Sequence, residues 1–188
     1  IDIGGESSRP GAQPLSLQQE LDRVMPAVYA LKDCGIAISV DTYKPEVMRE
    51  VIAAGADMIN DIRGFQSPGS VAAVADSDVG LCVMHMQNTP EIMQKTPVYE
   101  DVVSEVNAFF KERVQTFVES GISLNRISLD PKIRLFLEGF DATNMIKIFA
   151  EFWILGVAKV PTGFCLFPFC YPSRFCPISL SHYFPPIF

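Results

Sequence analysis

The first 131 residues of the chain predict an α/β fold in which parallel strands alternate with helices. Short apolar runs end at polar residues, and amphipathic helical patterns lie between these runs. Continuous apolar runs suit the strands of a parallel sheet that is buried on both faces. The order strand, helix, strand recurs every 20 to 45 residues or so, about the length of right-handed βαβ units. Together these observations predict a partial (β/α)8 TIM barrel with about five of its eight strands recognisable.

Five segments have the pattern of a strand that ends at polar residues. Ile1-Asp2-Ile3 alternates apolar and polar side chains and is followed by two glycines. The other four segments are apolar runs followed by acidic, amide or imidazole side chains: 36–40, 57–59, 79–84 and 126–129. No G-x-G-x-x-G sequence follows the first strand, which disfavours a dinucleotide-binding fold.

The first predicted helix, over residues 17–31, has the strongest signals. Ser16 and Gln19 form a capping box at its start. Apolar residues then recur at spacings of three and four, which places them on one helix face: Leu17, Leu21, Val24, Val28 and Leu31. Pro26 lies within this segment and predicts a kink.

Three further segments have helical patterns of decreasing strength. Residues 45–54 begin with a proline, which suits a first turn, and are followed by Gly55, which suits a helix end. Residues 102–117 carry apolar side chains at helical spacing and are followed by Gly121. Residues 67–77 predict a shorter helix.

The chain divides in composition at residue 131. Residues 1–131 hold 19 of the 22 acidic residues and 10 of the 15 basic ones, whereas residues 132–188 hold 10 of the 14 phenylalanines and 6 of the 14 prolines. From Pro161 onward no helical period is present, and prolines interrupt every strand pattern. We therefore predict a barrel fragment over 1–131 and an irregular tail over 132–188.

Charge and cysteine content narrow the classes of function. The net charge of −7 argues against nucleic acid as a partner, and no run of 18 apolar residues predicts a membrane span. No secretory signal is recognisable. The five cysteines lack the spacing of a zinc site, and Cys34 and Cys82 are expected to pack as small apolar residues. The odd cysteine count suggests a reducing compartment, so we expect a cytoplasmic protein.

Polar side chains that can bind ligands follow four of the predicted strands. They are Glu6-Ser7-Ser8-Arg9, Asp41-Thr42, Asn60-Asp61 and Asp130. In a (β/α)8 barrel the carboxyl ends of the strands meet around one mouth, where active sites are built. Carboxylates and an amide at such a mouth can recognise the amino-amide edge of a flat heterocycle and stabilise a developing cation. A guanidinium beside hydroxyls can hold a phosphate or a carboxylate.

Each of these residues also has a purely structural interpretation. Asp41 and Asp61 could cap the turns or helices that follow them. Asp130, which precedes a proline, could initiate a turn. His85 could be a packed histidine at a strand end, and the neighbouring Met84 a core or pocket-wall residue.

Five motifs, taken in order and spacing, resemble the dihydropteroate synthases of folate biosynthesis. They are DIGGESSRPGA, SVDTYKPEV, ADMINDIRGF, VMHMQ and ISLDP, and they cover about the first 130 residues. Related pterin-binding methyltransferases share the barrel, but GESSRPG followed by VDT and IND is closer to the synthases. The resemblance implies a transferase that joins a dihydropterin diphosphate to 4-aminobenzoate with release of diphosphate.

The resemblance also implies roles for individual residues at the strand ends. Asp41, Asn60 and Asp130 would bind the polar edge of the pterin, and Met84 would form part of the pocket wall. Asp41 and Asp130 would also act catalytically, because their negative charge favours an exocyclic pterin cation.

The segment after the first strand would contact the remaining substrate groups. By the resemblance, Ser7, Ser8, Arg9 and Pro10 belong to a mobile loop that orders over the substrates; Ser8 stands where the family more often has threonine. Magnesium would neutralise the diphosphate, but the family's asparagine ligand for it would precede Ile1, so no metal ligand is predicted in this chain. Sulfonamides would compete with 4-aminobenzoate, and family members are often homodimers.

The chain departs from the family pattern after Pro131. The Gly/Phe-rich loop, the Ser-Arg-Lys-Ser strand and the Arg-x-His-Asp strand of the family are not found in residues 132–188. One hypothesis is a frame-shifted or mis-joined translation of these residues, and another is a genuine fusion to an unrelated tail. The alternative function is accordingly a non-catalytic fragment that at best binds pterin weakly.

Overall fold

A five-stranded parallel sheet is the centre of the fold in the computed structural model, which describes residues 1–7, 13–86 and 99–131. The strands lie in sequence order, each pairing in parallel with the next. They are β1 (Asp2–Gly4), β2 (Ser39–Asp41), β3 (Met58–Asp61), β4 (Gly80–Met84) and β5 (Ile127–Asp130). This arrangement confirms the predicted α/β class and its five consecutive barrel strands.

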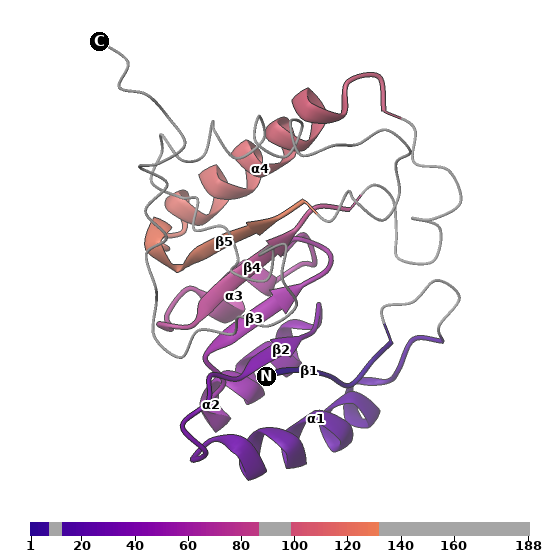
Figure 1. Ribbon diagram of the computed structural model, residues 1–188, viewed down its shortest axis with the longest axis vertical. Coiled ribbons are helices and arrows are strands. Elements are labelled where there is room, and N and C mark those ends of the chain that lie inside the picture. Colours follow the sequence, from indigo (N-terminus) through magenta and orange to yellow (C-terminus); the bar gives the residue numbers. More distant parts are fainter. Residues whose placement is uncertain (8–12, 87–98, 132–188) are drawn as a thin grey trace, which may run out of the picture.

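Four α-helices within the described ranges connect the strands. They are α1 (Leu17–Leu31), α2 (Pro45–Ala54), α3 (Ser70–Val74) and α4 (Val102–Glu119), and a short 3₁₀ helix η1 (Leu124–Arg126) precedes β5. Figure 1 shows the strands stacked from β1 to β5, with α1 and α2 at one end of the stack and α4 beside β5 at the other.

The structure confirms the predicted start of α1 and the predicted ends of α2 and α4. The capping box is formed, with the Ser16 hydroxyl accepting from the Gln19 N–H and the Gln19 side chain accepting from the Ser16 N–H. Gly55 ends α2 with φ of 107°, and Gly121 follows α4 with φ of 77°. These are left-handed conformations, in which glycine carries no Cβ penalty.

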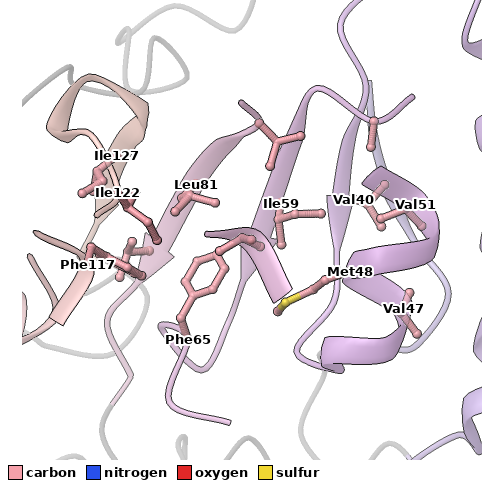
Figure 2. Close-up of a cluster of buried hydrophobic side chains, with 14 of the residues drawn as sticks. Val40, Val47, Met48, Val51, Ile59, Phe65, Leu81, Phe117, Ile122 and Ile127 are labelled. Carbon is pink, nitrogen blue, oxygen red and sulfur yellow. The ribbon is translucent and has the colours of Figure 1, made fainter. Parts of the chain in front are cut away.

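One hydrophobic core lies between the sheet and the helices. Figure 2 shows Val51 of α2 beside Val40 of β2, with Met48 extending toward the side of the sheet that carries Ile59 of β3; Val47 belongs to the same buried cluster. Phe65 follows β3 and packs edge to face on Phe117 of α4, with ring centroids 5.5 Å apart. Burial of these side chains supplies the main stabilisation of the fold.

Alternation along the strands separates the two faces of the sheet. One register row contains Ile3, Val40, Ile59, Leu81 and Ile127, and all but the partly buried Ile3 are buried in the core against the helices. Side chains of the next row therefore project from the opposite, inner face. That row contains Gly4, Asp41, Asn60, Cys82 and Ser128.

The structure corrects the bounds or burial of several predicted segments. The predicted strand 36–40 begins only at Ser39; the Ile38 carbonyl accepts from two N–H groups, those of Asp57 and Met58, and Ile36 is 51% exposed. Cys34 is exposed, whereas Cys82 is buried as expected. The short helix is confined to α3, within the predicted 67–77.

Several predictions fall outside the described residues or are not tested by them. Ser8, Arg9, Pro10 and residues 132–188 lie outside the described ranges. The boundary at residue 131 and the frame-shift hypothesis therefore stay predictions. Among the described residues, no helix combines the length and low polarity that crossing a membrane requires.

Arg126 fixes the amino-terminal edge of the sheet, away from the strand ends that carry polar residues. Its Nε donates to the Val79 carbonyl at 2.9 Å and its Nη2 donates to the Val74 carbonyl at 2.8 Å. These bonds join the start of β5 to the α3–β4 connection and satisfy carbonyls that no strand pairs.

We expect Phe117→Ala to lower the free energy of unfolding by about 3–5 kcal/mol, because it opens a cavity beneath Phe65. The matched control is Val118→Ala, at the next position of the same helix. Val118 is 51% exposed, so its loss should change stability by less than about 0.5 kcal/mol. Urea titrations monitored by circular dichroism measure both; equal effects would contradict the core described above.

Candidate functional site

Register places four of the predicted site residues on the inner face, at the carboxyl ends of the strands. Asp41 of β2 lies directly opposite Asn60 of β3, and Met84 of β4 lies opposite Asp130 of β5. Asp41 and Asn60 belong to the inner-face row, and Met84 and Asp130 lie two residues beyond Cys82 and Ser128 of that row, so both pairs are on the face turned away from the helices. The parallel sheet therefore brings together side chains that are up to 89 positions apart in sequence.

The inner face is also polar nearer the amino ends of the strands. The Asn60 side-chain amide donates to the Asp2 carboxylate at 3.4 Å. Asp2 lies on β1, two residues before Gly4 and therefore on the same face of the sheet. Gly4 leaves room there, since a Cβ built on it would lie 3.6 Å from the Cβ of Asp41. Asp2 is a residue that the sequence analysis did not select.

Asp61 faces the other way and has a structural role. Its two carboxylate oxygens accept from the N–H groups of Arg63 at 2.7 Å and Phe65 at 2.9 Å. It thereby caps the turn after β3, in which Phe65 has φ of 58°, and this confirms the structural alternative. Burial raises the pKa of Asp61 to about 7, and the charge of Asp41 acts in the same direction.

An apolar wall adjoins the polar face. Ile62 and Met84 are buried together, with Tyr43 and Met86 packed against them. The Arg63 guanidinium lies over the Tyr43 ring, its central carbon 3.8 Å from the ring centroid. Carboxylates and an amide beside an apolar and aromatic wall suit a flat heterocycle with a polar edge.

The loop after β1 is anchored through Glu6. Its carboxylate accepts from the Tyr43 hydroxyl at 2.7 Å, from Lys44 Nζ at 2.5 Å and from the Leu15 N–H at 2.9 Å. Burial acts to raise the pKa of Glu6, but the hydrogen bonds from Lys44, Tyr43 and Leu15 outweigh it and hold the pKa below its ordinary value. Glu6 thus links the loop after β1 to Leu15, nine positions later, and to Tyr43 and Lys44 of the β2–α2 loop.

Lys44 connects Glu6 to a second carboxylate, that of Glu20 on α1. Glu20 is 1% exposed; it forms an ion pair with Lys44 and accepts from the Thr42 hydroxyl at 2.6 Å. Burial acts to lower the pKa of Lys44, but hydrogen bonds to Glu20 and Glu6 raise it above its ordinary value. The two carboxylates and the ammonium therefore form one compact charged cluster.

The sequence analysis did not select Glu20, Tyr43 or Lys44. A signal for Glu20 was available: it precedes Val24 and Val28 at spacings of four, so a carboxylate lies on the buried face of α1. Leu17, which the prediction placed on that face, is 38% exposed. Tyr43 and Lys44 follow Asp41 within the same motif, but nothing local indicates their partners.

His85 is packed rather than available for chemistry. It is 8% exposed, and its ring meets Phe109 edge to face at a centroid distance of 5.0 Å. Burial lowers the pKa of His85 to about 4, so the imidazole is neutral at pH 7. The backbone N–H of His85 donates to the carbonyl of Asp130, which ties the ends of β4 and β5 together.

Within the described ranges, no group of three or more His, Cys, Asp or Glu side chains is arranged to hold a metal ion. Ser7 is exposed at the end of the described part of its loop. The predicted substrate contacts of Ser7, Ser8, Arg9 and Pro10 stay predictions, and so do the individual roles of Asp41, Asn60, Asp130 and Met84.

Comparison with curated proteins and solved structures identifies similar chains. The dihydropteroate synthase of Escherichia coli is 47% identical over 132 residues, which are 70% of this chain and 47% of that protein. The crystal structure of Burkholderia cenocepacia dihydropteroate synthase complexed with 7,8-dihydropteroate is 52% identical, with a TM-score of 0.65, over 69% of this chain and 47% of that one. The Yersinia pestis enzyme in a sulfonamide drug complex is 42% identical, with a TM-score of 0.72, over 86% of this chain and 58% of that one.

These matches agree with the motifs at the strand ends. The chain spans about half the length of the curated relatives it matches. The family model described as pterin binding enzyme matches residues 1–164, which include all five strands and the candidate site. The chain therefore belongs to the pterin-binding enzyme family.

Proposed function

We propose that the chain has the activity of a dihydropteroate synthase, joining a dihydropterin diphosphate to 4-aminobenzoate. The observation that carries the proposal is the grouping of Asp41, Asn60 and Asp130 at the carboxyl edge of one sheet face, beside the Met84 wall. The similar enzymes of B. cenocepacia and Y. pestis, which bind 7,8-dihydropteroate and a sulfonamide, support the same ligand classes.

In the proposed reaction the amine nitrogen of 4-aminobenzoate forms a bond to the exocyclic methylene carbon of the pterin. The bond from that carbon to the diphosphate oxygen breaks, diphosphate leaves with the electron pair, and the amine loses a proton. Asp41 and Asp130 would accept N–H donors of the pterin and stabilise positive charge as diphosphate departs. Asn60 would contribute an amide to the same polar edge.

Magnesium is the cofactor that the family resemblance implies, but the described residues do not form a site for it. No step of the proposed reaction is therefore assigned to a metal ion. A cytoplasmic location and a homodimeric assembly also remain predictions from the resemblance and the composition.

The alternative is a chain that binds pterin without turning it over. It is favoured by the charge of the inner face, where the described positions include Asp2, Asp41, Asn60 and Asp130 but no lysine or arginine. Diphosphate and the carboxylate of 4-aminobenzoate both need cationic partners. A cation does lie beside the face rather than on it: the Arg63 guanidinium, which stacks on the Tyr43 ring of the apolar wall.

Diphosphate release tests the proposal against this alternative. We expect the purified 188-residue chain, supplied with dihydropterin diphosphate, magnesium and 4-aminobenzoate, to release diphosphate only when the aminobenzoate is present. A folded chain that binds pterin but releases none would establish the alternative. Binding of neither pterin nor a sulfonamide would refute both functions.

We expect Asp41→Asn to weaken pterin binding by about 10- to 100-fold. Asparagine keeps one oxygen acceptor, but it replaces the second acceptor with an N–H donor and removes the charge that strengthens both hydrogen bonds. The control is Asp57→Asn, at an exposed position on the opposite edge of β3, where the amide oxygen can still accept from the Ile38 N–H. Quenching of pterin fluorescence measures both. Equal affinities for the two variants would contradict the assigned role of Asp41.

Asp61 gives stability a specific pH dependence. Burial raises its pKa to about 7 in the folded state, against an ordinary value of 3.8. Between about pH 4 and pH 7 the folded state therefore holds a proton that the unfolded state has lost. As pH rises through this window, wild type should lose stability relative to Asp61→Asn, and the difference should level off above pH 7. Urea unfolding at each pH measures it; a constant difference would contradict the raised pKa.

A further inference from the structure

A buried carboxylate on α1 lies directly behind the strand end that carries Asp41. Glu20 is 1% exposed, and its two oxygens are used by two residues of the β2–α2 loop: Thr42, through its hydroxyl, and Lys44, through its ammonium. A carboxylate on the buried face of a helix is costly to desolvate, and an apolar residue at the same position would usually stabilise the fold at least as well. The position of Glu20 therefore calls for a reason other than stability.

Thr42 connects this carboxylate to the candidate site. It follows Asp41 directly and is 2% exposed. Its N–H donates to the Asn60 carbonyl at 3.0 Å, and its hydroxyl oxygen accepts from the Lys44 N–H at 3.2 Å while donating to Glu20. The Thr42 N–H and hydroxyl are thus both engaged, and Thr42 fixes the backbone between the two neighbouring site residues Asp41 and Asn60.

We propose that Glu20 and Thr42 are a pair of positioning residues that hold Asp41 in its binding geometry. Glu20 fixes the Thr42 hydroxyl from the helix layer, and Thr42 fixes the end of β2 against β3. Lys44 neutralises Glu20 and extends the same cluster to Glu6, so the loops after β1 and β2 are held together. This inference rests on the proposed pterin-binding function of Asp41.

The geometry favours positioning over a general contribution to folding. Glu20 bonds Thr42, the residue directly after Asp41, and Thr42 in turn bonds the carbonyl of Asn60. These contacts therefore lie at the carboxyl edge of β2 and β3, next to the two site residues. Misplacement of a binding group by about 1 Å can cost two orders of magnitude in function. A residue that holds Asp41 in place should therefore influence ligand affinity as well as stability.

The test compares pterin affinity, by fluorescence quenching, for variants that remain folded at the temperature used. Thr42→Val keeps the shape but removes the hydroxyl, and we expect it to weaken binding about tenfold. Thr42→Ser restores the hydroxyl and should bind within about twofold of wild type. Glu20→Met removes both the acceptor of the Thr42 hydroxyl and the ion pair with Lys44, so it should weaken binding at least as much as Thr42→Val. Adding Thr42→Val to Glu20→Met should weaken binding no further, because the Thr42–Glu20 contact is already lost.

Arg126→Met is the control for stability alone. It removes partly buried hydrogen bonds at the amino-terminal edge of the sheet, so it should lower the unfolding midpoint without changing pterin affinity. Unchanged affinity in Thr42→Val, failure of Thr42→Ser to restore binding, or an equal loss in Arg126→Met would overturn the proposal.

A measurement without ligand separates this inference from the proposed function. In chain labelled with ¹³C-carboxyl aspartate, the Asp41 signal is assigned by its loss in Asp41→Asn. We expect Thr42→Val to shift that signal and Arg126→Met to leave it in place. If wild type binds no pterin, the proposed function fails, and the carboxyl signal still decides whether Thr42 positions Asp41: an unshifted signal would overturn it.

Discussion

The parallel register of β2 and β3 is the constraint on which the site depends. Val40 and Ile59 are opposite each other and buried against the helices, so Asp41 and Asn60 must project from the other face. Strand alternation has a period of two, and a slip of one residue would exchange Asn60 for Asp61 on the inner face. The hydrophobic core therefore selects which of two adjacent polar residues faces a ligand.

The buried polar groups around this register are satisfied in two different ways. Asp61 accepts from two backbone N–H groups and stabilises a tight turn, whereas Glu20 is neutralised by Lys44 and bonded by Thr42. An unpaired carboxylate in either place would carry the full cost of desolvation. Each therefore restricts its loop to one arrangement, since any other would leave the charge without partners.

The sequence predicts the parts of this structure that depend on local signals. Apolar runs ending at Asp41, Asn60 and Asp130 locate the strand ends, and the Ser16 capping box locates the start of α1. Contacts between distant elements were not predictable in this way: Lys44 meets Glu20 and Glu6, 24 and 38 positions away. Residues 36–38 of the predicted strand 36–40 lie outside β2, because apolar residues alone do not supply the ladder hydrogen bonds that a strand requires.

The four residues after Val40 show how binding and anchoring share one segment. Asp41 lies on the inner face, Thr42 is held by Glu20, Tyr43 supports both Glu6 and Arg63, and Lys44 joins the two carboxylates. A loop of this kind has little freedom to move without breaking buried polar contacts. Rigidity at the strand end lowers the entropy lost when a ligand binds. A binding group placed among its own anchors is therefore preorganised by the same contacts that fold the loop.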